Sequence, residues 1–337
     1  MAQPLNLSRM WKDMLDLCNL KPTEHVAVLT RVGAPSSYAK NAVWAAEAAA
    51  ASVTYLEVPD PSSLPPTALA AIAKSDLLID LAFSHDQRVF KTLKDGLRVL
   101  VALEPPEILA RMFPTQEDRR RCLAAKHRLG YANTMHVVSD AGTDFTVSLG
   151  DFASKCQYGF ADEPGRWDQW PGAFVTTYPN DGSANGTVVL DRGDMLFPMK
   201  NYLHGQVCLT VKDGFITNIE GGLDADFLKD VFESYNDPNV YAISHLGWGL
   251  SANGRWNSLG FYDKAGTEGQ DGRAFYGNFL FSTGPNTSAG GTRATPCHID
   301  IPMRNCSVFL DNQAIVLKGE IMPDDQRVPM PATLAAE

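Results

Sequence analysis

Short apolar runs alternate with helical patterns through the first 140 residues of the chain. Four runs read as buried strands: His25–Thr30, Val53–Val58, Asp76–Phe83 and Arg98–Leu103. The segments between and after them carry helical patterns: Tyr38–Ala51, Thr67–Lys74, Asp86–Lys94 and Thr115–Leu129. Strands that alternate with helices predict βαβ units, and therefore a mostly parallel sheet covered by helices.

The pattern changes at about Ala141, where short alternating runs are separated by Gly, Asn and Asp. These runs predict strands: Thr143–Leu149, Phe174–Tyr178, Gly186–Leu190, Gln206–Lys212, Phe215–Glu220, Val308–Asp311 and Ala314–Ile321. Asp213-Gly214 predicts a tight hairpin, and Asp224–Ser234 predicts a helix. The fold class is therefore α/β. We expect a mostly parallel α/β N-terminal domain over residues 1–140 and a β-rich, α+β C-terminal domain over residues 141–337.

Composition narrows the class of protein. A chain of 337 residues is long enough for about two domains with cores of their own. Its 29 Lys and Arg against 39 Asp and Glu give a net charge of −10, which disfavours nucleic acid and anionic membranes as partners. No apolar run is long enough to span a bilayer, and Met1–Leu20 reads as an amphipathic helix and not as a signal peptide. The six cysteines lie far apart, so we expect reduced thiols in a cytoplasmic protein.

The triplet His298-Ile299-Asp300 is the first candidate for chemistry. On a strand, residues i and i+2 face the same side, so the imidazole and the carboxylate point into one volume and can chelate a metal. Taken alone, the triplet fits a solvated strand face better than a metal site.

His245 strengthens the metal hypothesis. It lies in Ala242–Leu250, an apolar and glycine-rich segment where a histidine without a partner is costly. The alternative is a core histidine with satisfied hydrogen bonds. Together with His298 and Asp300 it completes two imidazoles and one carboxylate. This is the facial triad of non-haem Fe(II) oxygenases, and the same set with a water could hold catalytic zinc. The residue types alone do not choose between the two metals.

Nucleotide-binding motifs are missing from the sequence. No G-x-G-x-x-G follows a predicted strand, and the glycine-rich run Gly284–Thr292 lacks the GK[ST] of a Walker motif. This run ahead of His298 is either a lid over the site or a structural loop.

Four segments resemble the aminopeptidase T type of metallo-aminopeptidases: Ala141–Leu149, Trp170–Val175, Ile243–Leu250 and Cys297–Ile301. The resemblance implies an α/β N-terminal domain and a β-rich metal-binding C-terminal domain. This chain departs from the family at its metal ligands. Phe174 and His245 stand where the peptidases carry metal-binding glutamates, and a histidine expected before Gly284 is absent. A two-metal peptidase site is therefore not expected, whereas a one-metal His/His/Asp site remains.

This one-metal pattern of two histidines and an aspartate resembles that of the 2,5-dihydroxypyridine 5,6-dioxygenase family. In that family, a histidine in an SHLGWG-like segment and a later H-x-D triplet hold Fe(II), which implies His245, His298 and Asp300 as the ligands here. The resemblance implies an Fe(II)-dependent, extradiol-type dioxygenase of nicotinate and nicotine catabolism. Such an enzyme opens the ring of 2,5-dihydroxypyridine with O₂ to give N-formylmaleamate. We expect this small aromatic substrate and O₂ as partners, and a homo-oligomer.

A nearby base is needed, because the phenolic oxygen is expected to bind iron as an oxyanion. His85 is the first candidate, since it follows the strand-like run Asp76–Phe83, where crevices form in α/β sheets. The alternative is a loop histidine at a helix start. His204 is the second candidate, on a predicted strand face shared with Tyr202, where a cross-strand polar pair is the alternative.

Two other classes of function stay open at this point. One is an aminopeptidase-like hydrolase that uses a single zinc ion. The other is a metal-free paralogue kept for binding. The carboxylates missing at Phe174 and His245 disfavour the hydrolase.

Overall fold

The computed structural model describes residues 6–34, 36–84 and 86–328 and divides the chain into two compact units. Unit 1 comprises Met1–Pro114 and Gln157–Gly172, and unit 2 comprises Thr115–Cys156 and Ala173–Glu337. This division differs from the single boundary at residue 140 expected from the sequence. The chain leaves unit 1 and returns to it, because a strand at Trp167–Trp170 completes the parallel sheet of unit 1.

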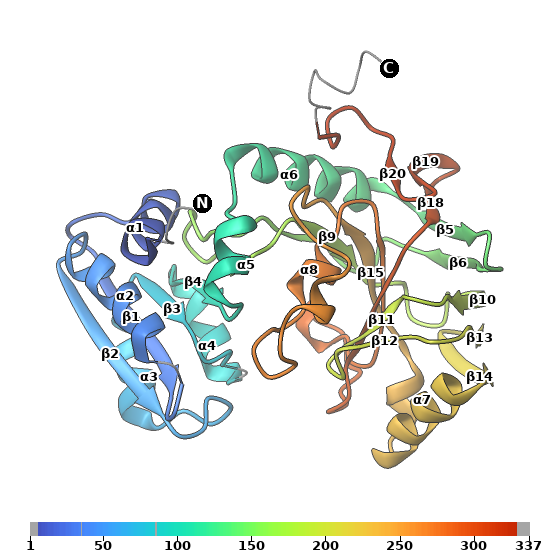
Figure 1. Cartoon of the computed structure of the whole chain (residues 1–337), viewed down its shortest axis with the longest axis horizontal. Helices are drawn as coiled ribbons and strands as arrows, with labels where there is room; N and C mark the ends of the chain where they lie inside the picture. The colour runs from blue at the N-terminus through green and yellow to red at the C-terminus, as the bar shows by residue number, and fades with distance from the viewer. Residues whose placement is uncertain (1–5, 35, 85, 329–337) are drawn as a thin grey trace. The chain divides into compact units, whose positions relative to one another are not determined.

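Unit 1 is built on a five-stranded sheet of order β2-β1-β3-β4-β8, in which every pairing is parallel. This confirms the predicted mostly parallel sheet. Its strands are β1 (His25–Arg31), β2 (Ser52–Val58), β3 (Leu77–Asp80), β4 (Arg98–Ala102) and β8 (Trp167–Trp170). Its helices are α1 (Leu7–Leu17), α2 (Ser36–Glu47), α3 (Pro66–Ile72), α4 (Gln87–Thr92) and α5 (Pro106–Arg111) (Figure 1).

Burial follows the position of each strand in this sheet. All residues of β3 and β4 are buried, as are the five central residues of β1, whereas most of the edge strand β2 is exposed or half-buried. Strands that are covered on both faces read as continuous apolar runs, which is why β1, β3 and β4 could be recognised in the sequence.

The fifth strand, β8, escaped sequence analysis because its central residue is a fully buried aspartate. The Asp168 carboxylate accepts hydrogen bonds from the Arg166 side chain and from the main-chain N–H groups of Gly159 and Gln169. Burial raises the pKa of Asp168 to about 6, and these donors oppose the rise.

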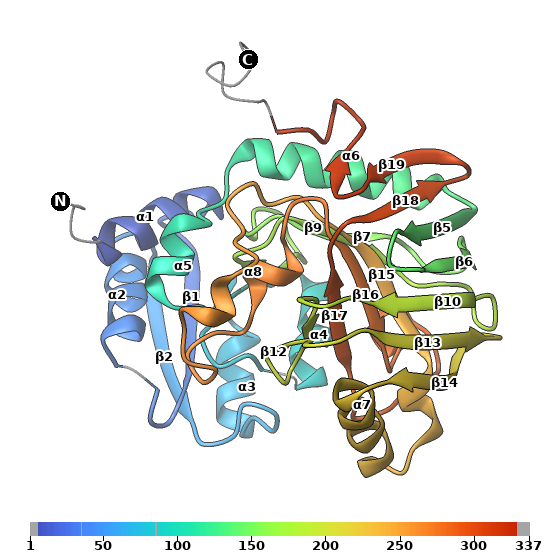
Figure 2. The same cartoon turned by 45° about the vertical axis from the view of Figure 1, so that its right-hand side comes forward.

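Unit 2 contains an eight-stranded antiparallel sheet of order β14-β13-β10-β6-β5-β18-β19-β20. The strands are β5 (Thr134–Ser139), β6 (Asp144–Ser148), β10 (Asn185–Leu190), β13 (Val207–Lys212), β14 (Phe215–Gly221), β18 (Cys306–Leu310), β19 (Gln313–Leu317) and β20 (Glu320–Ile321). The β13–β14 pair confirms the hairpin predicted at Asp213-Gly214. Helix α7 (Leu223–Ser234) lies against β13 and β14 (Figure 2).

A second sheet of unit 2 has the order β17-β16-β15-β9-β7. Its strands are β7 (Lys155–Gln157), β9 (Phe174–Thr177), β15 (Ile243–Gly249), β16 (Phe279–Thr283) and β17 (Ile299–Met303). The remaining elements of unit 2 are α6 (Gln116–Tyr131), α8 (Gln270–Arg273) and the short ribbon of β11 (Met195–Leu196) and β12 (Asn201–Tyr202). These sheets confirm the predicted β-rich second half.

Two further findings concern the chain as a whole. Among the described residues, no helix is both long and apolar enough to cross a membrane. The segment after β20 is held in place as far as Val328. Gln326 is fully buried and accepts a hydrogen bond from the Trp248 indole, and the Val328 N–H donates to the Tyr276 hydroxyl.

Candidate metal centre

His245, His298 and Asp300 come together in the second sheet of unit 2. The Nε2 atoms of the two histidines lie 3.1 Å apart. The Oδ1 atom of Asp300 lies 3.1 Å from Nε2 of His245 and 3.2 Å from Nε2 of His298. Side-chain exposure is 15%, 38% and 7% for His245, His298 and Asp300, so the site opens on the side of His298.

A bulge in β15 sets the position of His245. Ile243 pairs with Thr283 and Leu246 pairs with Phe281, so Ser244 and His245 together oppose a single residue, Ser282, on β16. A bulge of this kind bends a strand and re-aims its side chains, and bulges are common beside active sites. The Ser282 hydroxyl donates to the main-chain carbonyl of His245 at 2.7 Å, which fixes the bulged residue.

Strand β16 lies between the two strands that supply the ligands. Asp300 on β17 pairs with Ser282, and residues directly opposite each other in antiparallel strands face the same side. Serine is small, so the imidazole of His245 and the carboxylate of Asp300 can meet above it. His298 immediately precedes β17 and reaches the same point, as the H-x-D spacing predicted.

Glycine at position 247 is required by the packing of β15 against β9. A Cβ atom there would lie 1.8 Å from the carbonyl oxygen of Val175, which is far inside contact distance. Gly247 therefore has a structural role, because it allows the bulged strand β15 to lie close to β9.

We expect Gly247→Ala to lower the free energy of unfolding by about 3 kcal/mol, the upper end of the usual cost of overpacking, since two paired strands would have to separate. Thermal and urea unfolding would measure the loss. Gly260→Ala is the matched control, because a Cβ at Gly260 meets nothing within 4 Å. Equal stabilities of the two variants would contradict the proposed role of Gly247.

The remaining polar atoms of the three side chains make contacts that suit a metal site. Nδ1 of His298 lies 3.0 Å from the main-chain oxygen of Thr283, so in the neutral ring Nδ1 carries the proton and the lone pair lies on Nε2, which faces Asp300. Oδ2 of Asp300 accepts from Nε of Arg273 at 2.6 Å. Oδ1 of Asp300 and Nδ1 of His245 are buried without a hydrogen-bond partner. A buried carboxylate oxygen that faces two imidazole nitrogens and lacks a donor is suited to a cation.

Charges within the cluster set its protonation. Burial lowers the pKa of His245, which favours the neutral imidazole that binds metals. Burial opposes ionisation of Asp300, but the positive charges of His298 and Arg273 hold the pKa of its carboxyl well below the usual range. Burial opposes protonation of His298, but the charge and hydrogen bond of Asp300, together with the Thr283 carbonyl, raise the pKa of His298. The carboxylate is therefore the fixed negative charge of the group.

The three ligand atoms are close enough together to bind a single ion. They are separated by 3.1, 3.1 and 3.2 Å. This is the one group of His, Cys, Asp and Glu with metal-ligand spacing that is found among the described residues.

The glycine-rich run Gly284–Thr292 is held by hydrogen bonds to neighbouring segments. Asn286 is fully buried and donates to Asp181 at 3.1 Å. Arg293, just after the run, bonds the carbonyl of Gly284 and the carboxylate of Asp181. The Ser288 hydroxyl lies 2.7 Å from that of Tyr178, whose ring packs edge-on against His245. These contacts favour the structural loop over the lid.

The two predicted acid–base residues were His85 and His204. His85 lies outside the described residues. His204 follows β12 instead of lying on it, so it does not share a strand face with Tyr202 as expected. Its side chain is 92% exposed and its Nδ1 lies 3.7 Å from Asp224, so Asp224 is its polar neighbour.

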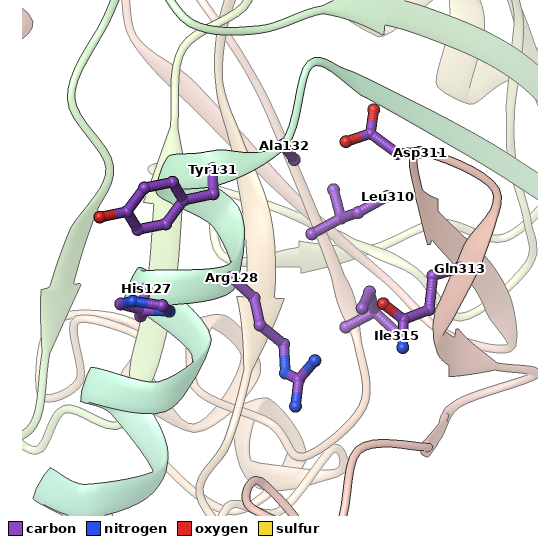
Figure 3. Close-up of a pocket in the computed structure, with 8 residues that line it drawn as sticks. All are labelled: His127, Arg128, Tyr131, Ala132, Leu310, Asp311, Gln313 and Ile315. Carbon is purple, nitrogen blue, oxygen red and sulfur yellow. The ribbon is translucent and has the colours of Figure 1, made fainter.

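A hollow of about 310 Å³ elsewhere in unit 2 does not involve the three ligands (Figure 3). Figure 3 shows His127 and Tyr131 from α6 on one side and Asp311, Gln313 and Ile315 on the other. The Asp311 carboxylate already accepts from the N–H groups of Asn133 and Thr134, and Arg128 pairs with Asp325. The charged groups of Arg128 and Asp311 are thus already paired within the protein.

Sequence analysis missed Arg273 and Thr283 as parts of the site. Arg273 meets Asp300 across 27 positions of the chain, and Thr283 contributes only a main-chain oxygen. No residue type marks either contact. The one usable signal is the all-apolar start of Phe279–Thr283, which reads as a buried strand between the two ligand segments.

Comparisons with known proteins identify the family of the chain. A curated 2,5-dihydroxypyridine 5,6-dioxygenase of Pseudomonas putida is 44% identical over 341 residues, covering 95% of this chain and 97% of the relative. The solved structure of 2,5-dihydroxypyridine dioxygenase from Pseudomonas putida KT2440 superposes with a TM-score of 0.92 at 43% identity, covering 97% of this chain and all of that one. AmpT from Thermus thermophilus shares the fold alone, with a TM-score of 0.63 at 12% identity over 94% of this chain and all of that one. The family model of 2,5-dihydroxypyridine 5,6-dioxygenase matches residues 6–323, and the chain therefore belongs to this family.

Proposed function

We propose that this chain opens the ring of 2,5-dihydroxypyridine with O₂ to give N-formylmaleamate, using one Fe(II) held by His245, His298 and Asp300. The activity is extradiol-type ring cleavage, and it places the enzyme in nicotinate and nicotine catabolism. The observation that carries the proposal is the triangle of ligand atoms, with its buried and unpartnered Oδ1 of Asp300. Membership of the dioxygenase family supports the substrate.

The atoms of the reaction balance without a further reactant. The C5–C6 bond of the ring breaks and both atoms of O₂ enter the product. C5 becomes the carboxyl carbon, and C6 becomes the formyl carbon on nitrogen. No external reductant is needed, because the electron-rich ring supplies the electrons that reduce O₂.

A bound Fe(II) would supply neighbouring open positions for the ring and O₂, and a route for electron density between them. The protein's part is to hold the three ligands on one face. Thr283 fixes the tautomer of His298, the buried setting keeps His245 neutral, and the ring of Tyr178 packs against His245. We assign His85 as the base that accepts the phenolic proton, with His204 as the second candidate.

The direct test is O₂ uptake by anaerobically purified protein loaded with Fe(II) and given 2,5-dihydroxypyridine. We expect one O₂ consumed for each ring opened, and a product two oxygen atoms heavier than the substrate by mass spectrometry. Metal analysis of the same sample is expected to find one iron per chain. An inactive protein that holds one iron would contradict the substrate assignment.

The hydrolase alternative is tested on the same preparation. Phe174 is buried where a peptidase of this fold would need a metal-binding carboxylate, so no bridging ligand holds a second ion. We expect no cleavage of aminoacyl substrates with Zn²⁺, Co²⁺ or Mn²⁺. Aminopeptidase turnover that is lost in Asp300→Ala would favour the hydrolase instead.

A cytoplasmic location and a homo-oligomeric state are further parts of the proposal. The cysteines form no disulfide with one another in the described part of the chain, which supports a reducing compartment. The mass of the native protein in solution, measured by light scattering, would test the oligomeric state.

A further inference from the structure

Arg273 is the cation that contacts the candidate ligand Asp300. It is the last residue of α8, and its Nε lies 2.6 Å from Oδ2 of Asp300. Side-chain exposure is 17% for Arg273 and 7% for Asp300, so little water competes for the contact. Charge-assisted hydrogen bonds of this length are strong, and they fix the geometry of the carboxylate.

The guanidinium of Arg273 is held in place from two further directions. Its NH1 group donates to the main-chain oxygen of Glu268, and its central carbon lies 4.3 Å from the centre of the Phe197 ring. Phe197 in turn exchanges main-chain hydrogen bonds of 2.9 and 3.1 Å with Asp300. The arginine, the ring beneath it and the carboxylate it contacts are thus joined in one rigid group.

The backbone that carries Arg273 passes close to the ring of Phe197. A Cβ atom at Gly269 would lie 2.0 Å from Cε1 of Phe197, so this close approach requires glycine. The position of the guanidinium is therefore set by backbone as well as by side-chain contacts.

The consequence concerns the two oxygens of Asp300. Oδ2 is engaged by Arg273, whereas Oδ1 faces the two imidazoles and has no hydrogen-bond donor. A carboxylate can bind a metal through one oxygen or through both, and the second oxygen would occupy a further coordination position. The contact of Arg273 with Oδ2 is short and largely shielded from water, so that oxygen is held away from the imidazoles.

We propose that Arg273 is a positioning residue that keeps Asp300 a one-oxygen ligand and so keeps a coordination position open for an exogenous ligand. This inference rests on the metal site of the proposed function. It adds the reason why three ligands leave room for the reaction, and it assigns the role to a residue that does not itself touch the metal.

The experiment uses Co²⁺ as the metal probe and azide as the exogenous ligand, with the full chain loaded with one equivalent of Co²⁺. In Arg273→Gln, Oδ2 is released and joins the ion. We expect cobalt to stay bound, its visible absorption to weaken as the coordination number rises, and azide affinity to fall about 10–100-fold. Arg273→Lys keeps a cationic donor and is expected to restore part of the azide affinity.

Arg304→Gln is the matched control, since Arg304 also stacks on an aromatic ring, that of Trp256 at 5.0 Å. It should match the wild type in both readouts. An unchanged spectrum and azide affinity in Arg273→Gln would overturn the role of Arg273. So would complete loss of cobalt, because the proposal gives Arg273 the orientation of the carboxylate and not the retention of the ion. A wild-type protein that takes up no cobalt would overturn the metal site itself.

Discussion

Replacing Asp300 or His298 with alanine is expected to remove the metal and, with it, turnover. Each variant leaves two of the three ligand atoms that lie within 3.2 Å of one another. The contribution of a metal to such chemistry is several kcal/mol, so we expect a loss of activity of roughly 10³-fold or more. Iron content and O₂ uptake, measured on the same anaerobic samples, would check both effects.

The two variants control for each other. Asp300→Ala leaves the buried Arg273 without its carboxylate and is therefore expected to lose stability as well, whereas His298→Ala keeps that ion pair. His136→Ala is the matched control, because His136 is an exposed histidine that pairs with Asp144 at 2.8 Å. Full iron occupancy in His298→Ala would remove His298 from the set of ligands.

His85→Ala is expected to separate metal binding from proton transfer. If His85 is the base, its loss leaves the iron in place and lowers turnover about 10²–10⁴-fold, the usual contribution of general acid–base catalysis. The measurements are iron content and the steady-state rate with 2,5-dihydroxypyridine. The assignment rests on the sequence, since His85 follows the apolar run that contains β3.

His25→Ala is the control for this experiment, because His25 lies in unit 1 and its ring is bonded to the Ser52 hydroxyl at 2.6 Å. It should keep both iron and activity. Near-normal turnover of His85→Ala would mean that His85 is a loop histidine and not the base, and His204 would then be the next candidate to test. Loss of iron would mean that the set of ligands has been assigned wrongly.

Strands covered on both faces could be predicted from their own residues, whereas a strand that depends on distant partners could not. The strands β1 and β4 were predicted almost to the residue, because each is covered on both faces and reads as an unbroken apolar run. β8 was not predicted, because Asp168 interrupts its pattern and is tolerated only through the donors that Arg166, Gly159 and Gln169 supply. A buried charge with distant partners cannot be read from neighbouring residues.

In the candidate metal site too, only the features that depend on nearby residues could be predicted from the sequence. His298 and Asp300 are two residues apart, so strand geometry alone predicted that they face one volume. His245 was assigned to the same site on its residue type and on the family resemblance. The bulge at Ser244 and His245, which orients its side chain, depends on pairing with β16 and could not be predicted. Arg273 was not foreseen at all, since its contact with Asp300 depends on how α8 lies against Phe197.

The late position of β8 in the chain has a consequence for synthesis on the ribosome. The sheet of unit 1 lacks its last strand until residue 170 has emerged, although its fourth strand ends at Ala102. At a translation rate of about 5–20 residues per second, the edge of β4 stays open for roughly 3–14 seconds. Helix α6 and strands β5 and β6, which belong to unit 2, are made during that interval. A nascent chain halted before Trp167 would therefore leave one edge of β4 unpaired, although all residues of that strand are buried in the finished fold, and such an edge can pair with another chain.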